Sequence, residues 1–417
     1  APRVVKMQEK NNKSNIKTLS LGCRLNALEA EKIKNMLAGM LHSAIVVNTC
    51  AVTGEAERQS GQSVRKLARQ NPDSPVFVTG CAATRNPELF YQIPNALVVA
   101  NHDKMNPSAY MNALAVAPCN FNTQKELVFH HNSPIMSKQF IQVQNGCNHS
   151  CTYCVTRLLR GTAVSFPYSD ILNDVRDAIT NGFNEIVLTG VDTASYAHNG
   201  MLISDVCKKL LQDVPEIRRL RISSFDPASP EIFKIIDLIH NDARMMPHMH
   251  LSMQSGADDI LRAMHRRHSA ETIRRIVQYA GADVTFSWDI ICGFPGETDE
   301  LFNQTLDLIN AVRPIKIHAF PFSPRPGTAA FDMPNRVPRQ KAKERVHQIS
   351  SVAEKYRLDF MKSNIGKTVS VLAEENNTAR TPHDIDVFIR GGRIPARTIC
   401  DVKLVEIQDD RYIGEIV

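Results

Sequence analysis

The sequence predicts an α/β fold in three parts: an open parallel α/β sheet, then a (βα)6 partial barrel, then a small antiparallel β-barrel. Three observations support this. Short apolar runs alternate with amphipathic stretches in residues 15–101, six longer alternations follow in residues 139–338, and residues 365–417 alternate apolar and polar side chains between Gly and Pro breaks.

The composition is that of an ordinary globular chain. It has 417 residues, 43% hydrophobic and 22% charged, which is enough for two or three cores. No apolar run reaches the length of a membrane span, and the N-terminal stretch lacks the apolar centre of a signal peptide. We therefore expect a cytoplasmic protein with no membrane contact.

The net charge of +6 is unevenly distributed. Residues 1–80 carry 12 Lys and Arg against 6 Asp and Glu, whereas residues 365–417 carry 7 against 9. A basic N-terminal part indicates a polyanionic partner such as nucleic acid.

Three cysteines mark the first part of the chain. Cys23, Cys50 and Cys81 each follow an apolar run, in "SLGC", "VVNTC" and "FVTGC". The carboxyl ends of parallel strands share one edge of the sheet, so these cysteines can converge. A lone cysteine is more often a small buried apolar residue, but the repetition at equivalent positions favours a ligand set.

The remaining segments follow in order. Residues 102–138 lose the alternation and are expected to form a linker. In residues 139–338, runs such as "EIVLTG" alternate with helical patterns such as "AETIRRIVQYAG", with the functional face expected at the strand carboxyl ends. Residues 339–364 are expected to form a connecting helix, and residues 365–417 a barrel of about five strands.

The most specific motif is "CNHSCTYC", which places Cys147, Cys151 and Cys154 on one loop after the first strand of the central part. Disulfides are not expected in a long chain without a signal peptide. Structural zinc takes four ligands, and His149 is the only candidate within the loop to complete a Cys3His set. The favoured interpretation is a 4Fe-4S cluster held by three thiolates, with one iron open.

With Tyr153 in its aromatic place, this loop resembles that of the radical S-adenosylmethionine (SAM) superfamily. The resemblance implies that the open iron chelates the amino and carboxylate groups of SAM. One electron from the cluster then cleaves SAM into methionine and a 5′-deoxyadenosyl radical.

Further motifs narrow the resemblance over residues 15 to 417. "LGCRLN", "NTCAVT", "TGCAA", "RLRISSFDP", "DIICGFPGET" and "FPFSPRPGT" resemble the methylthiotransferases, and the first two are most similar to the tRNA N6-threonylcarbamoyladenosine enzymes. This implies that Cys23, Cys50 and Cys81 hold a second 4Fe-4S cluster and that the last barrel is similar to a TRAM domain. It also implies methylthio transfer to adenosine C2 at position 37, with one SAM methylating the sulfur and a second supplying the radical. The segment "VTRLLRG" departs from the family, which often has a proline there.

Eight residues are candidate SAM contacts, from the resemblance or from their place at strand ends: Tyr153, Gly190, Asp192, Ser252, Gln254, Gly293, Gly296 and Glu297. Other readings stay open for several of them. The "GFPGETDE" stretch also fits a tight turn with Thr298 as a helix N-cap, and Ser252 and Gln254 also fit a polar barrel interior. No catalytic residue is assigned beyond the cluster ligands.

Four arginines are candidate tRNA contacts: Arg266, Arg267, Arg390 and Arg393. A solvated surface is the alternative for the first pair. The expected partners are a tRNA anticodon stem-loop and a low-potential electron donor similar to flavodoxin or ferredoxin. No ligand role is expected for the other cysteines, which are Cys119, Cys207, Cys292 and Cys400.

Two other functions compete with this interpretation. The same chemistry could act on isopentenyladenosine or on a ribosomal protein. An iron-sulfur electron carrier or RNA-binding protein without catalysis would bind clusters but not cleave SAM.

Overall fold

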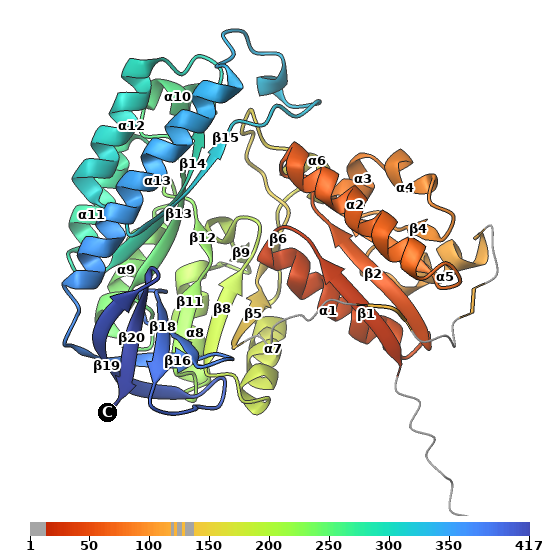
Figure 1. The fold of residues 1–417 in the computed structure, drawn as a ribbon, viewed down its shortest axis with the longest axis horizontal. Helices are drawn as coiled ribbons and strands as arrows, with labels where there is room; N and C mark the ends of the chain where they lie inside the picture. The colour runs from red at the N-terminus through yellow and green to blue at the C-terminus, as the bar shows by residue number, and fades with distance from the viewer. Residues whose placement is uncertain (1–13, 118–120, 123–126, 130–136) are drawn as a thin grey trace, which may run out of the picture. The chain divides into compact units, whose positions relative to one another are not determined.

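The computed structural model describes residues 14–117, 121–122, 127–129 and 137–417. The chain divides into two compact units, Ala1–Asn132 and Ser133–Val417, and both combine strands with helices (Figure 1). The α/β fold class is therefore confirmed. Cys119 lies outside the described residues.

The first unit is a parallel sheet in the order β1-β2-β3-β4, with helices between the strands. The two central strands are buried along their whole length. The elements are β1 (Asn15–Ser20), α1 (Arg24–Ala38), β2 (Ser43–Thr49), α2 (Gly54–Gln70), β3 (Val76–Gly80), α3 (Cys81–Arg85), α4 (Glu88–Tyr91), β4 (Ala96–Val98) and α5 (Pro107–Ala115).

Helix α5 lies inside the segment that was expected to be a linker. Its Tyr110 is fully buried, packs edge-on against Phe77 at 5.2 Å between ring centroids, and donates a hydrogen bond of 2.8 Å to the carbonyl of Lys104. The Lys104 ammonium lies 2.5 Å from the Glu29 carboxylate, and both side chains are buried. The helix was not expected because these contacts are tertiary and leave no periodic pattern in the sequence.

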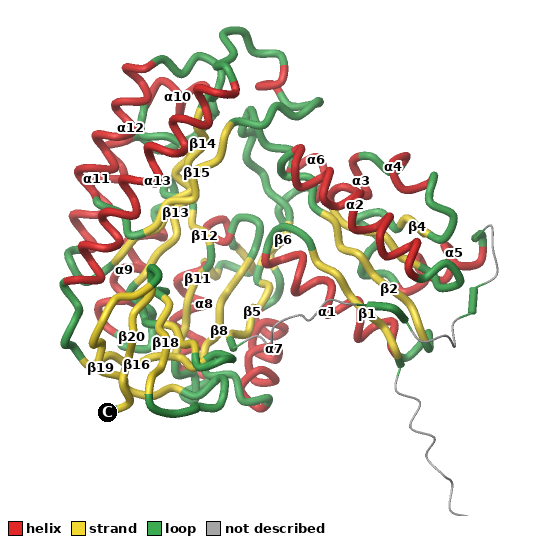
Figure 2. Tube along the Cα trace, in the orientation of Figure 1, coloured by secondary structure: helices red, strands yellow, loops and turns green. Residues whose placement is uncertain are grey.

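The second unit opens with six parallel strand-helix repeats. Strands β5, β8 and β11 pair with one another, as do β12 to β15, and a bridge between Leu220 and Met245 joins the two groups. Helices lie outside these strands (Figure 2), which is the arrangement expected for a partial barrel. The main elements are β5 (Lys138–Gln142), α7 (Tyr168–Thr180), β8 (Glu185–Thr189), α8 (Ile203–Asp213), β11 (Arg219–Ile222), β12 (Ser224–Phe225), α9 (Glu231–Asn241), β13 (His248–Gln254), α10 (Asp258–Ala263), α11 (Ala270–Ala280), β14 (Thr285–Cys292), α12 (Asp299–Val312) and β15 (Lys316–Pro321).

Shorter helices and strands lie in the connections of this unit. They are β6 (Gln144–Asn145), α6 (Thr156–Arg160), β7 (Val164–Ser165), η1 (Thr193–Ser195), β9 (Ala197–His198), β10 (Met201–Leu202) and η2 (Ala329–Phe331).

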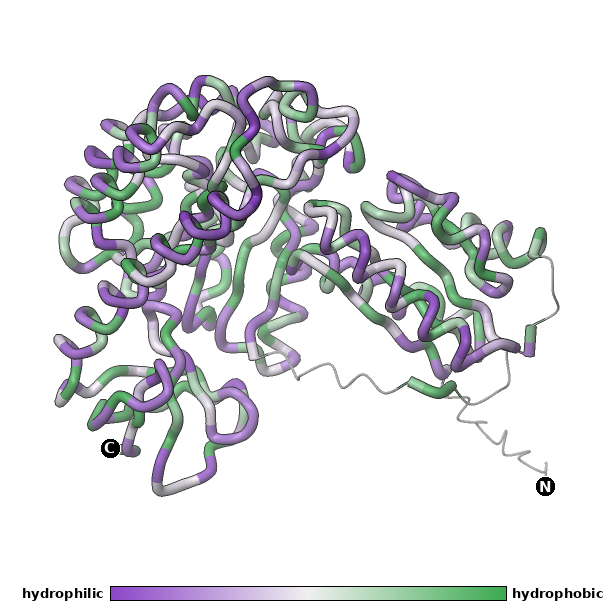
Figure 3. The backbone as a smooth tube through the Cα atoms, turned by 45° about the horizontal axis from the view of Figure 1, so that its top comes forward, coloured by the Kyte–Doolittle hydropathy of each residue, from purple (hydrophilic) through white to green (hydrophobic). Residues whose placement is uncertain are grey.

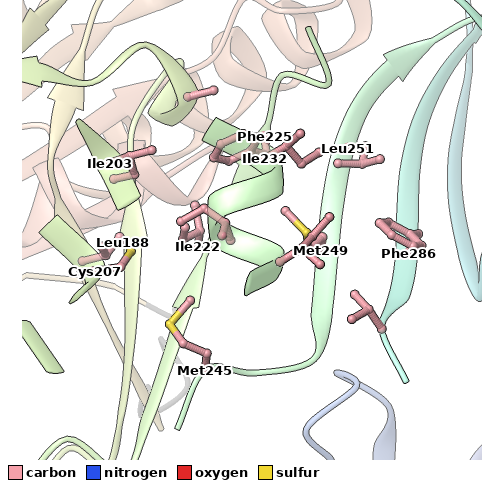
Figure 4. Close-up of a cluster of buried hydrophobic side chains, with 14 of the residues drawn as sticks. Leu188, Ile203, Cys207, Ile222, Phe225, Ile232, Met245, Met249, Leu251 and Phe286 are labelled. Carbon is pink, nitrogen blue, oxygen red and sulfur yellow. The ribbon is translucent and has the colours of Figure 1, made fainter. Parts of the chain in front are cut away.

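The two faces of the barrel strands differ in chemistry. Leu188, Ile222, Met249 and Phe286 belong to one buried apolar core with Ile232 of α9 (Figure 4). Hydrophilic and hydrophobic residues alternate along the covering helices (Figure 3), which bury their apolar side on the strands. The opposite face of the strands, toward the barrel interior, is mostly polar.

Helix α13 (Arg339–Lys362) packs along β15 and leads to a closed five-stranded barrel. Its strands are β16 (Thr368–Ala373), β17 (Thr378–Arg380), β18 (Asp386–Arg390), β19 (Ile399–Gln408) and β20 (Arg411–Ile416). The predicted barrel is present, but β18 and β20 pair in parallel, so it is not antiparallel throughout.

Candidate active site

The cysteine loop is held in place by backbone contacts. The amide of Cys147 donates to the carbonyl of Gly161 at 3.1 Å, and the Thr152 hydroxyl donates to the carbonyl of Ala263 at 2.9 Å. Gly146 has φ +69, and a Cβ there would lie 1.9 Å from the Thr162 carbonyl oxygen. Only glycine fits at that position.

Each sulfur of this loop lies near one N–H donor. The donors are the His149 amide on Cys147 (3.4 Å), the Thr156 amide on Cys154 (3.4 Å) and the Arg266 guanidinium on Cys151 (3.7 Å). An N–H group directed at each sulfur stabilises the thiolate form, and such hydrogen bonds tune the reduction potential of iron-sulfur clusters. The donor set therefore fits a cluster with three cysteine ligands.

Burial opposes ionisation of two of the three thiols, those of Cys147 and Cys154. It raises the pKa of Cys147 to about 11, with smaller contributions from Asp192, Cys154 and Cys151, and it raises the pKa of Cys154 as well. A bound metal must displace the protons.

His149 does not complete a Cys3His zinc set. Within the described chain, its ring nitrogen groups with only one of the three sulfurs, that of Cys147, and with an oxygen of Asp192, all within 4.8 Å of one another. Its Nε2 lies 2.6 Å from Asp192 Oδ2. The ring therefore faces the strand end, away from a fourth corner among the thiolates.

Asp192 lies beside the Cys147 sulfur and Gly190 lies against Gln144, and their contacts with SAM remain predictions. The Asp192 amide donates to Gln144 Oε1 at 2.9 Å, and a Cβ at Gly190 would lie 3.0 Å from the same oxygen. Asp192 Oδ2 is buried, and its partner is the His149 ring at 2.6 Å. A buried carboxylate close to the Cys147 sulfur suits a cationic ligand group such as the ammonium of SAM.

Arg266 corrects the sequence interpretation. It was expected on a tRNA-facing surface, but its side chain is only 7% exposed, and it donates to Asp226 Oδ1 at 2.9 Å and to the Ser252 carbonyl at 2.8 Å. Its Nε is buried without a hydrogen bond in the part of the chain that the structure describes. That donor suits an anionic group such as the SAM carboxylate.

Asp226 is a site residue that sequence reasoning missed. Burial would raise its pKa, but Arg266 brings the pKa below its ordinary value, so it is ionised. Arg267, which is 58% exposed, donates to its other oxygen at 2.9 Å. The signal was available in "SSFDP", where an acidic residue ends a strand.

Ser252 and Gln254 do not share a regular strand face. The register of β13 against β14 shifts between Leu251 and Gln254, and Gln254 has φ +71. A β-bulge therefore redirects this strand end, as bulges near active sites do.

The turn after β14 is largely structural. The Glu297 carboxylate accepts from the Gly293 amide at 3.0 Å and pairs with Arg345 of α13 at 2.5 Å, and burial raises its pKa. Thr298 caps α12 by accepting from the Leu301 amide at 3.3 Å. Glu297 thus has partners inside the protein, whereas a Cβ at Gly296 would meet open space.

The Tyr153 side chain packs the cysteine loop against an apolar cluster. Its ring packs edge-on to Phe294 at 6.5 Å, beside the buried Ile260 and Met264. The side chain therefore packs on an apolar cluster, and its predicted contact with SAM remains a prediction.

The first three cysteines follow three adjacent strands of the first unit. Cys23 precedes α1, Cys50 follows β2, and Cys81 begins α3. A Cβ at Gly22, which has φ +88, would lie 2.4 Å from Cys50 Sγ. The loop before Cys23 therefore reaches the Cys50 side chain at one edge of the sheet.

The last barrel shows no concentration of unpaired positive charge at its two predicted arginines. Arg390 pairs with Glu406 at 3.1 Å, and Arg393 is exposed beside Glu374 and Glu375 in a surface depression. Their contact with tRNA remains a prediction. Cys207 and Cys292 are buried in the core.

Among the described residues, none of the helices has the length and apolar character needed to cross a membrane.

Comparisons with known proteins agree with the geometry. Residues 141–309 match the radical SAM superfamily, and residues 15–100 match the uncharacterized protein family UPF0004. A threonylcarbamoyladenosine tRNA methylthiotransferase, MtaB of Rickettsia prowazekii, is 37% identical over 391 residues, covering 90% of this chain and 92% of its own. The protein of the same name from Chlamydia pneumoniae is 32% identical over 426 residues, covering 97% and 99%.

More distant likenesses follow. A tRNA-2-methylthio-N(6)-dimethylallyladenosine synthase of Endomicrobium trichonymphae is 29% identical over 423 residues, covering 95% of this chain and 99% of its own. The solved structure of the radical SAM methyltransferase TsrM from Kitasatospora setae has a TM-score of 0.53 at 14% identity, covering 72% of this chain and 68% of that one. At that identity the likeness is one of fold.

Proposed function

Because this chain belongs to the methylthiotransferase family of radical SAM enzymes, we propose that it adds a methylthio group to C2 of N6-threonylcarbamoyladenosine at position 37 of tRNA. The observation that carries the proposal is the three-cysteine loop at the mouth of the partial barrel. Each of its sulfurs lies near an N–H donor, and no fourth cysteine is present in the loop.

Two sets of residues hold the metal clusters in this proposal. Cys147, Cys151 and Cys154 hold the cluster of the barrel, and the first-unit set of Cys23, Cys50 and Cys81 holds the auxiliary cluster. When bound, the clusters and SAM supply a carbon radical and a sulfur source, which adenine C2–H requires because it is not acidic enough for a general base.

The surrounding side chains bind and orient SAM. Asp192 faces the ammonium group with a buried carboxylate that also contacts His149, and Arg266 offers a buried N–H to the carboxylate. Asp226 fixes the Arg266 guanidinium, which in turn faces the Cys151 sulfur. The residues thus connect the SAM site to the cluster loop.

The remaining partners belong to the same proposal. The substrate is the anticodon stem-loop, the electron donor is a low-potential protein similar to flavodoxin or ferredoxin, and the enzyme acts in the cytoplasm. The basic first unit supports a polyanionic substrate.

Isopentenyladenosine is the second candidate substrate, because the relative from Endomicrobium trichonymphae is named for it. Mass spectrometry of tRNA nucleosides from a strain lacking the gene separates the two. Loss of the methylthio form of threonylcarbamoyladenosine supports the proposal, and loss of the isopentenyl form alone overturns it. Formation of 5′-deoxyadenosine from SAM and dithionite excludes a non-catalytic iron-sulfur protein.

A further inference from the structure

Three neighbouring strands present one polar face toward the barrel interior. Leu251 and Trp288 point to the helix-covered core, so the alternate residues of β13, β14 and β15 point the other way. That face carries His250, Ser252, Ser287, Asp289, His318 and Phe320.

Asp289 lies on β14, one strand beyond β13, which carries the predicted SAM contacts Ser252 and Gln254. Leu251 pairs with Trp288, and after a register shift Gln254 pairs with Ile290, so Asp289 lies between these two pairs, across from the Ser252–Met253 bulge. Asp289 in turn pairs with His318 of β15. Since neighbouring strands lie about 4.8 Å apart, Asp289 and His318 lie about one and two strand spacings from β13, which together span the width of a nucleobase.

The Asp289 carboxylate is held in one orientation. His250 Nε2 lies 3.0 Å from Asp289 Oδ2, and its Nδ1 lies 2.8 Å from the Ser287 hydroxyl. The same hydroxyl contacts Nε2 of the buried His248 at 3.0 Å. A carboxylate accepts hydrogen bonds, so these contacts hold the Asp289 acceptor oxygens in place.

The Asp289 side chain remains 30% exposed although its partners lie deeper in the barrel. Beside it, the rings of His318 and Phe320 stack at an interplanar angle of 13°, and Phe320 is 45% exposed. An acceptor next to an accessible aromatic pair matches a flat base that carries an exocyclic N–H.

We propose that Asp289 is a substrate-binding residue whose carboxylate accepts the N–H at position 6 of the modified adenine, with His318 and Phe320 beside the base. This inference rests on the proposed function and names the group by which the base is held. Binding through the 6-substituent leaves C2 uncovered. His250 and Ser287 are positioning residues that act through Asp289.

The test uses the anaerobically reconstituted full-length enzyme and two anticodon stem-loop RNAs. One carries N6-threonylcarbamoyladenosine, and the other carries the same nucleoside with a methyl group in place of the N6 hydrogen. Loss of one hydrogen bond to a charged group corresponds to about a tenfold to hundredfold change. For the wild type, we expect the methylated RNA to raise KM by that factor.

Asp289→Asn replaces the acceptor by an amide whose oxygen is taken by His250, which leaves an NH2 group facing the substrate. We expect it to raise KM for the first RNA by the same factor and to abolish discrimination between the two RNAs. Ser287→Ala should raise KM less than Asp289→Asn does. Asp307→Asn is the matched control, because that residue is exposed on α12.

The outcomes distinguish a failure of the Asp289 role from a failure of the proposed function. Product from the wild type, together with an Asp289→Asn variant that discriminates between the RNAs as the wild type does, overturns this inference alone. Absence of methylthio product from the wild type on either RNA overturns the proposed function. The methylated RNA tests the wild type directly and so covers the case in which the variant does not fold. Equal KM for both RNAs on the wild type also overturns the inference.

Discussion

Replacing Glu185 by Gln should destabilise the second unit, because this carboxylate neutralises three cations at the base of the barrel. Glu185 is fully buried, and its oxygens lie 3.0 Å from Arg221, 3.2 Å from Lys138 and 3.4 Å from Arg219. The two arginines also donate to carbonyls of the last barrel, including that of Pro382 at 3.0 Å. Glu185 therefore supports the contact between the two barrels.

The size of the expected loss of stability follows from the pKa of Glu185. Burial alone would raise the pKa of Glu185, but Arg221, Lys138 and Arg219 lower it from 4.5 to about 2. Each pKa unit corresponds to about 1.4 kcal/mol, so the ionised form stabilises the fold by about 3 kcal/mol. Since the folded pKa lies below the ordinary value, this stability is present above about pH 4.5 and is lost as the pH falls toward 2. Leaving the cations unpaired costs about 3–5 kcal/mol.

Urea unfolding followed by tryptophan fluorescence measures the effect, because the single tryptophan, Trp288, is buried in β14. At pH 7 we expect Glu185→Gln to lower the free energy of unfolding by about 3 kcal/mol, and the deficit should shrink at pH 3. Glu354→Gln, an exposed position on α13, is the control. If both variants unfold at the same urea concentration at pH 7, the reasoning is wrong.

Three further changes test the site. Gly146→Ala should remove about half of the bound iron, because the added Cβ would clash with the Thr162 carbonyl. Iron analysis of the purified variant checks this, and a full iron content would contradict it. Gly22→Ala should remove the other half through its clash with Cys50 Sγ, while SAM cleavage by the barrel cluster persists; loss of that cleavage would refute the separation of the two sites. Arg266→Lys should weaken SAM binding by about tenfold or more, because lysine cannot keep the bonds to Asp226 and Ser252 together; unchanged affinity in equilibrium dialysis would exclude this role.

The layout of the fold could be predicted because periodicity is a local property of the chain. The strand and helix alternation and the spacing of Cys147, Cys151 and Cys154 are visible in sequence alone. The position of each cysteine after a strand follows from the same pattern, since the carboxyl ends of parallel strands share one edge.

Several assignments could not be made because they depend on distant partners. Arg266 lies in a run of basic residues that is typical of a solvated helix end, and only Asp226, 40 positions away, accounts for its burial. The pairing of Glu297 also depends on a distant residue, because its partner Arg345 belongs to a helix that starts much later in the chain. The bulge before Gln254 arises from strand pairing and has no sequence signature in this chain.

The most direct test of two three-thiolate metal sites is the iron content of anaerobically prepared protein. About eight irons per chain are expected for the wild type, and about four for a variant in which Cys147, Cys151 and Cys154 are all serine. A wild-type value near four, lost entirely in that variant, would show that the first three cysteines bind no cluster and would contradict the proposed sulfur transfer.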